Sequence, residues 1–443
     1  MKVVVIGGVA GGASAAARIR RLDEQAEIVM FERGEHVSFS NCSLPYYISG
    51  TVPTSEALVM MSPEKFKKQH NIDARVRSEV IAINRAEKTV TVQDLQTGAT
   101  YDEPYDKLVL APGANAVVPK SIRGADQPHV FAVRNVTDIR RLKDYADQVQ
   151  ARNIVVAGGG FVGLEIAENF CHAGKHVTLV EGSSQVMAPF DFDMAQILHK
   201  ELLDQGMDVY LSSMVTEITP NSVIAKRGDK TVEIPADVVL LSIGVRQETA
   251  LAQKAGLEIG ASNGIKVNHN YQTNDPDIYA VGDAVETFDR LARRYGSFAQ
   301  ASPAQRQARA AADHICGIYN SNNGYIATSC LRVFSQNAAC TGMNERAAQQ
   351  AGIPYDIAYV LPADKVSIMP ESHYMAFKLL FEVPTGRVLG AQAVGQGDVV
   401  RRIDVIATLI TLGGTLEDLK EMELCYAPVY GTAKDVVNMA ALV

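Results

Sequence analysis

The stretch NIVVAGGGFVG, residues 153–163, decides the fold. Its apolar start predicts a strand buried on both faces of a parallel sheet. Glycines follow at the GxGxxG spacing, as Gly158, Gly160 and Gly163. Downstream, LEIAENFCHAG predicts a helix, and HVTLVEG predicts a second strand that ends at Glu181. Because glycine lets a diphosphate approach the N-terminus of a helix closely, this order of elements predicts a dinucleotide-binding βαβ unit.

The N-terminus repeats the pattern. MKVVVI predicts a buried strand, GGVAGG follows, ASAAARIRRL predicts a helix, and AEIVMFERG predicts a strand that ends at Glu32. Gly7 would make the tight turn and Gly12 would let the helix pack on the strand, but Val9 stands where the middle glycine is usual. Two complete units in one chain are stronger evidence than one glycine motif alone.

Further segments complete the predicted organisation. YDKLVLAPGA (105–114) and ADVVLLSIGV (236–245) are each typical of the strand that closes a nucleotide-binding domain. TNDPDIYAVGDAV (273–285) predicts a turn, a short strand and the pair Gly282-Asp283. From about Asn322 the pattern changes to alternating strands with two helical stretches and no nucleotide motif, which predicts a third domain.

Composition narrows the class of protein. The 443 residues are 47% hydrophobic and 21% charged with a net charge of -8, which indicates a soluble globular protein of two or three domains. A net negative chain is unlike a general nucleic-acid binder. The first apolar run is too short for a signal peptide, and no run reaches the roughly 18 residues of a membrane span. We therefore expect a cytoplasmic protein with no nucleic-acid or membrane partner.

The cysteines form no CxxC pair, so the sequence indicates neither a metal site nor a disulfide framework. Five of them read as small buried hydrophobic residues: Cys171, Cys316, Cys330, Cys340 and Cys425. The sixth, Cys42, lies in SFSNCSLPYY, and the position five residues later, where a second redox cysteine would stand, is Tyr47. Cys42 therefore either acts alone or is structural.

The two glycine motifs, the closing strands and YAVGDAV together resemble the FAD- and NAD(P)-dependent pyridine nucleotide-disulfide oxidoreductases. GGVAGGASAAARIRRLDE, SFSNCSLPYY, QRQAR and YAPVYGTAKD narrow the resemblance to the coenzyme A disulfide reductase subgroup, which includes CoA persulfide reductases and some NADH oxidases. It covers essentially the whole chain. It implies an α/β fold with two Rossmann-like domains, one for FAD (1–115 and 246–321) and one for NAD (116–245), and an α+β C-terminal dimerisation domain (322–443).

The resemblance also implies site residues. We expect FAD to contact the first unit and its closing segments, with Asp283 on the ribityl chain, at Gly7, Gly8, Gly12, Glu32, Arg33, Val80, Pro112, Gly113, Gly282 and Asp283. The nicotinamide cofactor is expected at Gly158, Gly160, Phe161, Gly163, Glu165, Glu181 and Gly244. Coenzyme A is expected at Arg18, Arg21, Ser38, Asn41 and Arg306.

The residues at the end of the strand HVTLVEG predict that the protein binds NADH in preference to NADPH. Glu181 should accept hydrogen bonds from both ribose hydroxyls, and its carboxylate would repel a 2'-phosphate. The next residues are Gly182, Ser183 and Ser184, so the sequence has no lysine or arginine there to bind such a phosphate.

Cys42 is the expected catalytic residue. Ser or Asn as a cap, with Pro45 near the first turn, predicts a short helix whose N-terminus would stabilise the thiolate that attacks a disulfide or persulfide. By resemblance, Cys42 forms a mixed disulfide with CoA, which electrons from NADH through FAD then resolve. In the homodimer that the resemblance implies, Tyr426 and Tyr430 of the partner subunit could donate hydrogen bonds to the leaving thiolate.

The sequence departs from the pattern of its relatives at two places that bear on the identity of the electron acceptor. The subgroup often has tyrosines where SIMPES places Ile368 and Met369, which puts efficient CoA disulfide reduction in doubt. Peroxidases and water-forming oxidases of the superfamily carry a histidine in the first glycine loop, where Ala10 stands, and this disfavours peroxide cleavage. Some relatives also carry a C-terminal rhodanese-like domain; none follows VVNMAALV, and the sequence leaves open whether one was removed.

Three functions remain open from the sequence. The first is an NADH-dependent reductase of CoA disulfide, CoA persulfide or polysulfide. The second is an NADH oxidase that passes electrons to oxygen. The third, a flavin-containing redox sensor that works through Cys42 modification, fits less well because a sensor needs no complete NAD unit.

Overall fold

The computed structural model describes residues 1–319 and 322–443, which form two compact units. Unit 1 comprises Met1–Val117, Val133–Arg141 and Val245–Tyr325, and unit 2 comprises Val118–Ala132, Leu142–Gly244 and Ile326–Val443. The chain thus crosses between the units several times. The boundary predicted at residue 321 lies outside the described residues.

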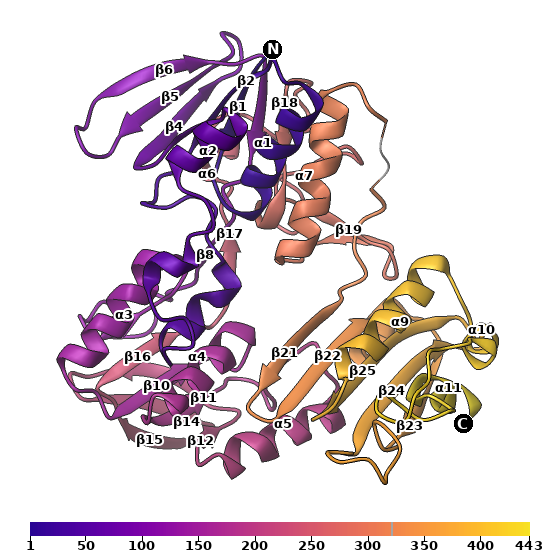
Figure 1. Ribbon diagram of the computed structural model, residues 1–443. Coiled ribbons are helices and arrows are strands. Elements are labelled where there is room, and N and C mark those ends of the chain that lie inside the picture. The colour runs from indigo at the N-terminus through magenta and orange to yellow at the C-terminus, as the bar shows by residue number, and fades with distance from the viewer. Residues whose placement is uncertain (320–321) are drawn as a thin grey trace. The chain divides into compact units, whose positions relative to one another are not determined.

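A five-stranded parallel sheet forms the centre of unit 1. Its order is β18 (Ile278–Ala280), β7 (Lys107–Leu110), β1 (Lys2–Ile6), β2 (Glu27–Phe31) and β3 (Asp73–Arg75). The apolar runs of β1 and β7 are buried because helices cover the sheet. Two of these helices, α1 (Ala10–Leu22) and α7 (Ala301–Ile315), pack side by side (Figure 1). The predicted first βαβ unit is confirmed.

Smaller elements of unit 1 surround this sheet, and the sequence pattern did not predict their pairing. They are the antiparallel sheet β4 (Ser78–Asn84), β5 (Thr89–Asp94) and β6 (Thr100–Pro104), the pair β8 (Ala114–Ala116) and β17 (Val245–Gln247), the pair β19 (Thr287–Asp289) and β20 (Arg294–Gly296), the helices α2 (Pro63–His70) and α6 (Ala250–Lys254), and the 3-10 helices η1 (Asn41–Tyr47), η2 (Ser55–Leu58) and η3 (Gly282–Ala284).

Unit 2 holds a second parallel sheet, ordered β12 (Asp208–Tyr210), β11 (His176–Val180), β10 (Asn153–Ala157), β16 (Val238–Leu241) and β9 (Val130–Phe131). The helix α4 (Phe161–His172) connects β10 with β11, and α5 (Phe192–Asp204) connects β11 with β12. A three-stranded antiparallel sheet of β13 (Met214–Ile218), β14 (Ser222–Arg227) and β15 (Lys230–Pro235) adjoins it, and α3 (Val136–Gln148) precedes β10. The second βαβ unit is confirmed at the predicted strand, Asn153–Ala157.

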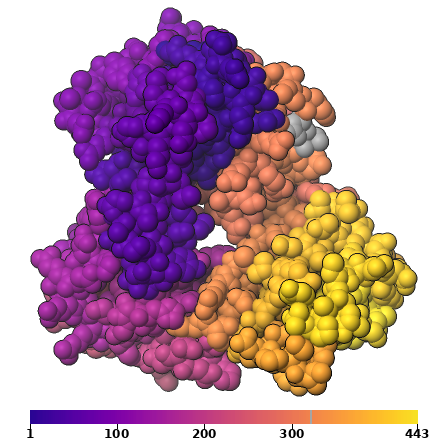
Figure 2. All heavy atoms as spheres, in the orientation of Figure 1, coloured from indigo at the N-terminus to yellow at the C-terminus, as the bar shows by residue number. Residues whose placement is uncertain are grey.

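The C-terminal part of unit 2, orange to yellow in Figures 1 and 2, is an antiparallel sheet with helices. Its order is β21 (Ser329–Val333), β22 (Gln336–Gly342), β25 (Val388–Gly395), β24 (Met375–Glu382) and β23 (Tyr355–Val360). The prediction of two helical stretches was wrong. The described residues form four, α8 (Glu345–Ala351), α9 (Val399–Leu412), α10 (Leu416–Glu421) and α11 (Val436–Leu442).

The helices that were missed are short and begin at side-chain caps. Asn344 accepts from the N-H of Ala347 at the start of α8, and Thr415 forms a capping box with Asp418 at the start of α10. Such caps supply hydrogen bonds that a one- or two-turn helix otherwise lacks, without producing a long apolar period. Within the described part of the chain, no helix has the length and apolarity needed to cross a membrane.

Candidate active site

Close contacts within the backbone fix the conformation of the first glycine loop. Gly7 has φ +97°, and a Cβ on Gly12 would stand 1.8 Å from the carbonyl oxygen of Gly7. The Glu32 carboxylate accepts from the N-H of Gly8 at 2.9 Å and of Gly34 at 2.8 Å. The structure therefore brings the predicted acidic residue to the glycine loop, where a nucleotide's ribose would lie.

The second glycine loop repeats this geometry with one difference. A Cβ on Gly163 would stand 2.0 Å from the oxygen of Gly158, and Glu181 accepts from the N-H groups of Gly159 and Ser183, both at 2.6 Å. A Cβ on Gly160, however, would meet no heavy atom within 4 Å. The chain itself does not require glycine there, so the space suits the close approach of a diphosphate.

Three further residues predicted for the nicotinamide cofactor belong to or follow the elements that flank this loop. Glu165 is on α4, where burial, assisted by the charge of Glu168, raises its pKa to about 7. Gly244 follows β16 with φ +122°, a conformation that side chains rarely adopt. Phe161 is the first residue of α4. A carboxyl with a pKa near neutrality can gain or lose a proton under working conditions.

The residues expected to hold FAD gather in unit 1. Asp283 lies in η3, and burial raises its pKa although the charge of Arg134 opposes the shift. Gly282 donates its N-H to Oε1 of Gln307 at 2.7 Å, which ties η3 to α7. A buried carboxylate needs hydrogen-bond donors, and ribityl hydroxyls can supply them. Val80 is buried in the core on β4.

Arg134 was not predicted. Its Nη2 donates to the carbonyl oxygen of Pro112 at 2.6 Å, and its Nη1 donates to Asn115. Burial and then the charge of Arg33 lower its pKa, while Glu32 among other carboxylates opposes that shift. The half-buried guanidinium of Arg134, which lies between the carbonyl oxygen of Pro112 and the side chain of Asn115, could pair with a diphosphate. No sequence pattern showed that the segment around Arg134 returns to unit 1.

Cys42 lies exposed in the first turn of η1. The expected short helix is confirmed, and Ser40 occupies its N-cap position, but the Ser40 side chain makes no cap hydrogen bond and its Oγ instead bonds to Oγ of Ser43 at 2.7 Å. Pro45 lies inside the helix, just after its first turn, and is buried. Cys42 therefore lies exposed near the start of a short helix.

Ser38 attaches this cysteine segment to the glycine loop. Its N-H donates to the carbonyl oxygen of Gly8 at 2.7 Å, and its own carbonyl accepts from Met60. Ser38 has φ +47°, an uncommon value for a residue other than glycine. The backbone thus links the nucleotide loop to the segment that carries Cys42.

The predicted CoA cations differ in their surroundings. Arg18 donates from Nε to the buried carboxylate of Asp313 at 2.7 Å, so part of its charge is already balanced. Arg21 and Arg306, like Asn41, are exposed. The intervening Arg20 is buried, and its guanidinium donates to main-chain carbonyls, including that of Ala26 at 2.6 Å, which indicates a structural role.

The two predicted tyrosines lie in unit 2, whereas Cys42 lies in unit 1. Tyr426 and Tyr430 are 52% and 69% exposed, so both phenols face outward. The carbonyl oxygen of Tyr430 accepts from Nη2 of Arg401 at 3.1 Å. Ile368, in the segment that departs from the subgroup pattern, is 86% exposed.

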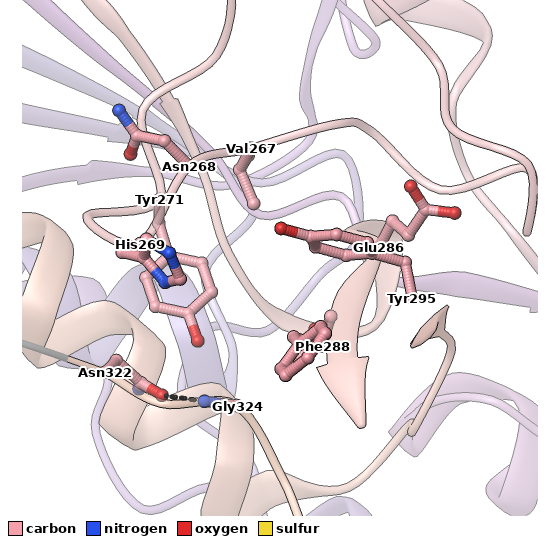
Figure 3. Close-up of a pocket in the computed structure, with 10 residues that line it drawn as sticks. Val267, Asn268, His269, Tyr271, Glu286, Phe288, Tyr295, Asn322 and Gly324 are labelled. Atoms are coloured by element: carbon pink, nitrogen blue, oxygen red, sulfur yellow. Dashed lines mark hydrogen bonds between the residues drawn. The ribbon is translucent and has the colours of Figure 1, made fainter. Parts of the chain in front are cut away.

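A pocket within unit 1 lies apart from these residues (Figure 3). Aromatic side chains, Phe288 and Tyr295 among them, line it together with Val267, and at one edge the N-H of Gly324 donates to Asn322. None of the predicted site residues lines this pocket. The candidate FAD site and the Cys42 segment lie in unit 1, and the candidate nicotinamide loop lies in unit 2.

Comparison with known proteins agrees with this geometry. Residues 1–308 match the family "pyridine nucleotide-disulphide oxidoreductase", and residues 329–436 match its dimerisation domain. The coenzyme A disulfide reductase of Staphylococcus haemolyticus is 31% identical over 99% of this chain and 98% of its own length.

Solved structures give the same result. The reduced CoADR-RHD of Bacillus anthracis is 42% identical with a TM-score of 0.97, covering all of this chain and 79% of that one. An NAD-dependent persulfide reductase from A. fulgidus is 35% identical with a TM-score of 0.96, covering 100% and 82%. A water-forming NADH oxidase from Lactobacillus brevis is 27% identical with a TM-score of 0.93, covering 100% and 97%.

These matches confirm the predicted resemblance and the fold of two Rossmann-like domains with a C-terminal dimerisation domain. The family uses FAD and a nicotinamide cofactor, and both glycine loops fit such ligands. The chain belongs to the pyridine nucleotide-disulphide oxidoreductase family and is an FAD-dependent disulfide oxidoreductase.

Proposed function

We propose that the protein is an NADH-dependent reductase of CoA disulfide, CoA persulfide or polysulfide that works through Cys42 alone, as a homodimer. The observation that carries this proposal is the exposed thiol of Cys42 on η1, in a segment that Ser38 joins to the first glycine loop, with Tyr47 where a second redox cysteine would stand. Because the chain offers no partner sulfur at that position, the substrate supplies the second sulfur.

The proposed chemistry balances with one cysteine. The Cys42 thiolate attacks one sulfur of CoA disulfide, a Cys42–CoA disulfide forms, and one CoA thiolate leaves. With CoA persulfide, attack on the CoA-side sulfur expels hydrosulfide and leaves the same mixed disulfide. FAD bound in unit 1 would deliver the two electrons of NADH that cleave this bond. The products of that cleavage are CoA thiol and the Cys42 thiolate.

Other side chains of the protein bind and orient. The exposed Arg21 and Arg306 would pair with CoA phosphates, and Arg18 would contribute less because it already pairs with Asp313. The partner subunit's Tyr426 and Tyr430 would donate hydrogen bonds to the leaving thiolate. Their exposure in unit 2 supports this role, because a phenol buried within its own subunit could not reach another one.

The preference for NADH rests on Glu181. Its two carboxylate oxygens accept from the N-H groups of Gly159 and Ser183, which holds the charge beside the glycine loop. A ribose with free hydroxyls can donate to this carboxylate, whereas a 2'-phosphate would meet a like charge. NADH is therefore favoured over NADPH.

The intact mass of the purified protein, with and without reductant, tests the proposal. We expect incubation with CoA disulfide to add one CoA, removable by reductant, to the wild type and to Cys425→Ser but not to Cys42→Ser. The prediction that the other five cysteines are buried was wrong for Cys330 and Cys425, which are both exposed, and Cys425 is therefore a matched control. An adduct that persists in Cys42→Ser, or no adduct in the wild type, would refute the role of Cys42.

The similarity to a water-forming NADH oxidase keeps oxygen as a second candidate acceptor. Ala10 opposes it, since the histidine expected in the first glycine loop of such oxidases is absent. Oxygen consumption with NADH alone, at a rate equal to that with CoA substrates, would favour the oxidase.

A further inference from the structure

An ion cluster around the buried side chain of Lys378 joins the C-terminal sheet to the segment that follows Glu181. Lys378 on β24 is 2% exposed, and its Nζ lies 3.2 Å from Asp191, 2.9 Å from Asp193 and 2.5 Å from Glu345. Burial alone would lower the pKa of Lys378, but hydrogen bonds to Glu345 and Asp193 and the charge of Asp191 raise it. Lys378 therefore stays charged because its carboxylate partners stabilise the protonated amine.

Gln392, directly opposite Lys378 on β25, completes the hold on Asp191. Its Oε1 accepts from the N-H of Asp191 and its Nε2 donates to Oδ2 of Asp191, both at 2.7 Å. The other oxygen of Asp191 accepts from the N-H of Glu345 at 3.0 Å. Every one of these partners of Asp191 belongs to the C-terminal domain.

Two more C-terminal side chains hold the residues just before Asp191. Nδ2 of Asn344 donates to the carbonyl oxygen of Pro189 at 3.2 Å, and Arg346 donates to that of Ala188 at 3.1 Å. The last turn of the segment 182–191 is thus fixed from the C-terminal domain, although the segment itself belongs to the nicotinamide domain.

The same segment touches the nicotinamide site at its other end. Glu181 immediately precedes it, and Ser183 within it donates to the Glu181 carboxylate at 2.6 Å. Met187 donates to the carbonyl oxygen of Gly159 at 2.9 Å, and Val186 is so close that a Cβ on Gly159 would stand 2.8 Å from its Cγ1. The side chains of Val186 and Met187 are fully buried, so the segment cannot shift without disturbing the glycine loop.

We propose that Lys378 and Gln392 of the dimerisation domain are positioning residues for NADH, because they fix the segment 182–191 and, through it, the Glu181 carboxylate. The inference rests on the proposed binding of NADH ribose by Glu181. It makes nicotinamide affinity and selectivity depend on a domain that carries no nucleotide motif.

The test compares dissociation constants of NADH and NADPH for Lys378→Met, Gln392→Met, Glu181→Ala and a control, Arg387→Met. Arg387 pairs with Glu382 on the same hairpin at 3.2 Å, and none of its described hydrogen bonds reaches the nicotinamide domain. We expect NADH to bind about tenfold more weakly to both positioning variants and NADPH to change little, with FAD content unaltered. Arg387→Met should bind NADH as the wild type does, and Lys378→Arg should restore part of the affinity.

Gln392→Met keeps the proposal falsifiable if Lys378→Met fails to fold, because it removes an uncharged side chain rather than a buried charge. Weaker NADH binding in Glu181→Ala together with unchanged binding in Gln392→Met would overturn the positioning role alone. Unchanged NADH binding in Glu181→Ala would overturn both the ribose assignment and the inference built on it. Equal losses for NADH and NADPH would also overturn it, since they would show a general structural effect.

Discussion

The two glycine loops of this chain share glycine at the first and last positions of the motif, and they differ, among other positions, at its middle position and again two residues after its last glycine. In both loops the first and last glycines are required by the protein itself, since a Cβ on Gly12 or Gly163 would collide with a carbonyl oxygen 1.8 or 2.0 Å away. The middle position is Val9 in one loop and the unobstructed Gly160 in the other. The comparison separates glycines that the fold requires from a glycine that the fold does not require.

The largest expected effect follows from the glycines that serve the fold. Gly163→Ala and Gly12→Ala should each lower the free energy of unfolding by about 4 kcal/mol or more, because the new Cβ meets rigid backbone. Urea titration monitored by circular dichroism measures this. Gly160→Ala is the matched control and should cost less than about 1 kcal/mol. Equal losses in all three variants would remove the distinction.

The second difference lies two residues after the last glycine, where α1 has Ser14 and α4 has Glu165. Burial raises the pKa of Glu165 to about 7, so the folded chain holds a proton that the unfolded chain releases. Stability should therefore fall as pH rises from about 4.5 to 7, by up to about 3 kcal/mol for a shift of this size.

Glu165→Gln removes this proton linkage. The variant should match the wild type at pH 4.5 and be more stable at pH 8, as urea midpoints at the two pH values would show. A difference that does not grow with pH would mean that Glu165 ionises normally in the folded protein.

The open space at Gly160 predicts the next effect. Gly160→Val should weaken NADH binding about 100-fold, equivalent to about 2.7 kcal/mol, because the side chain fills the space left for the diphosphate. The melting temperature and FAD content should stay within error of the wild type. Val9→Gly, the reverse change in the other loop, should leave NADH affinity unaltered. Tight NADH binding to Gly160→Val would show that the nucleotide does not approach there.

The smallest effect concerns selectivity. Glu181→Gln keeps the shape of the ribose contact and removes its charge, so the preference for NADH over NADPH should fall about tenfold, or about 1.4 kcal/mol. Steady-state kinetics with each cofactor would measure it. An unchanged ratio would assign the selectivity to other residues.

The sequence predicted those elements that have a regular pattern over neighbouring residues. Both βαβ units were found because buried parallel strands are uniform apolar runs, and because Glu32 and Glu181 end such runs. The antiparallel hairpins and the short helices α8 and α10 were missed because their signals are side-chain caps and pairings rather than periodicity. Arg134 and Lys378 were missed because their partners include residues more than twenty positions away, as in the Lys378–Asp191 pair.

The central claim is that Cys42 passes the electrons of NADH to a sulfur of CoA disulfide, CoA persulfide or polysulfide. Anaerobic oxidation of NADH, followed at a fixed protein concentration with CoA disulfide, CoA persulfide or polysulfide, tests it most directly. We predict rapid turnover with at least one of these acceptors in the wild type and in Cys425→Ser, and a loss of at least about 1000-fold in Cys42→Ser. Turnover that needs oxygen, or that survives in Cys42→Ser, would contradict the account.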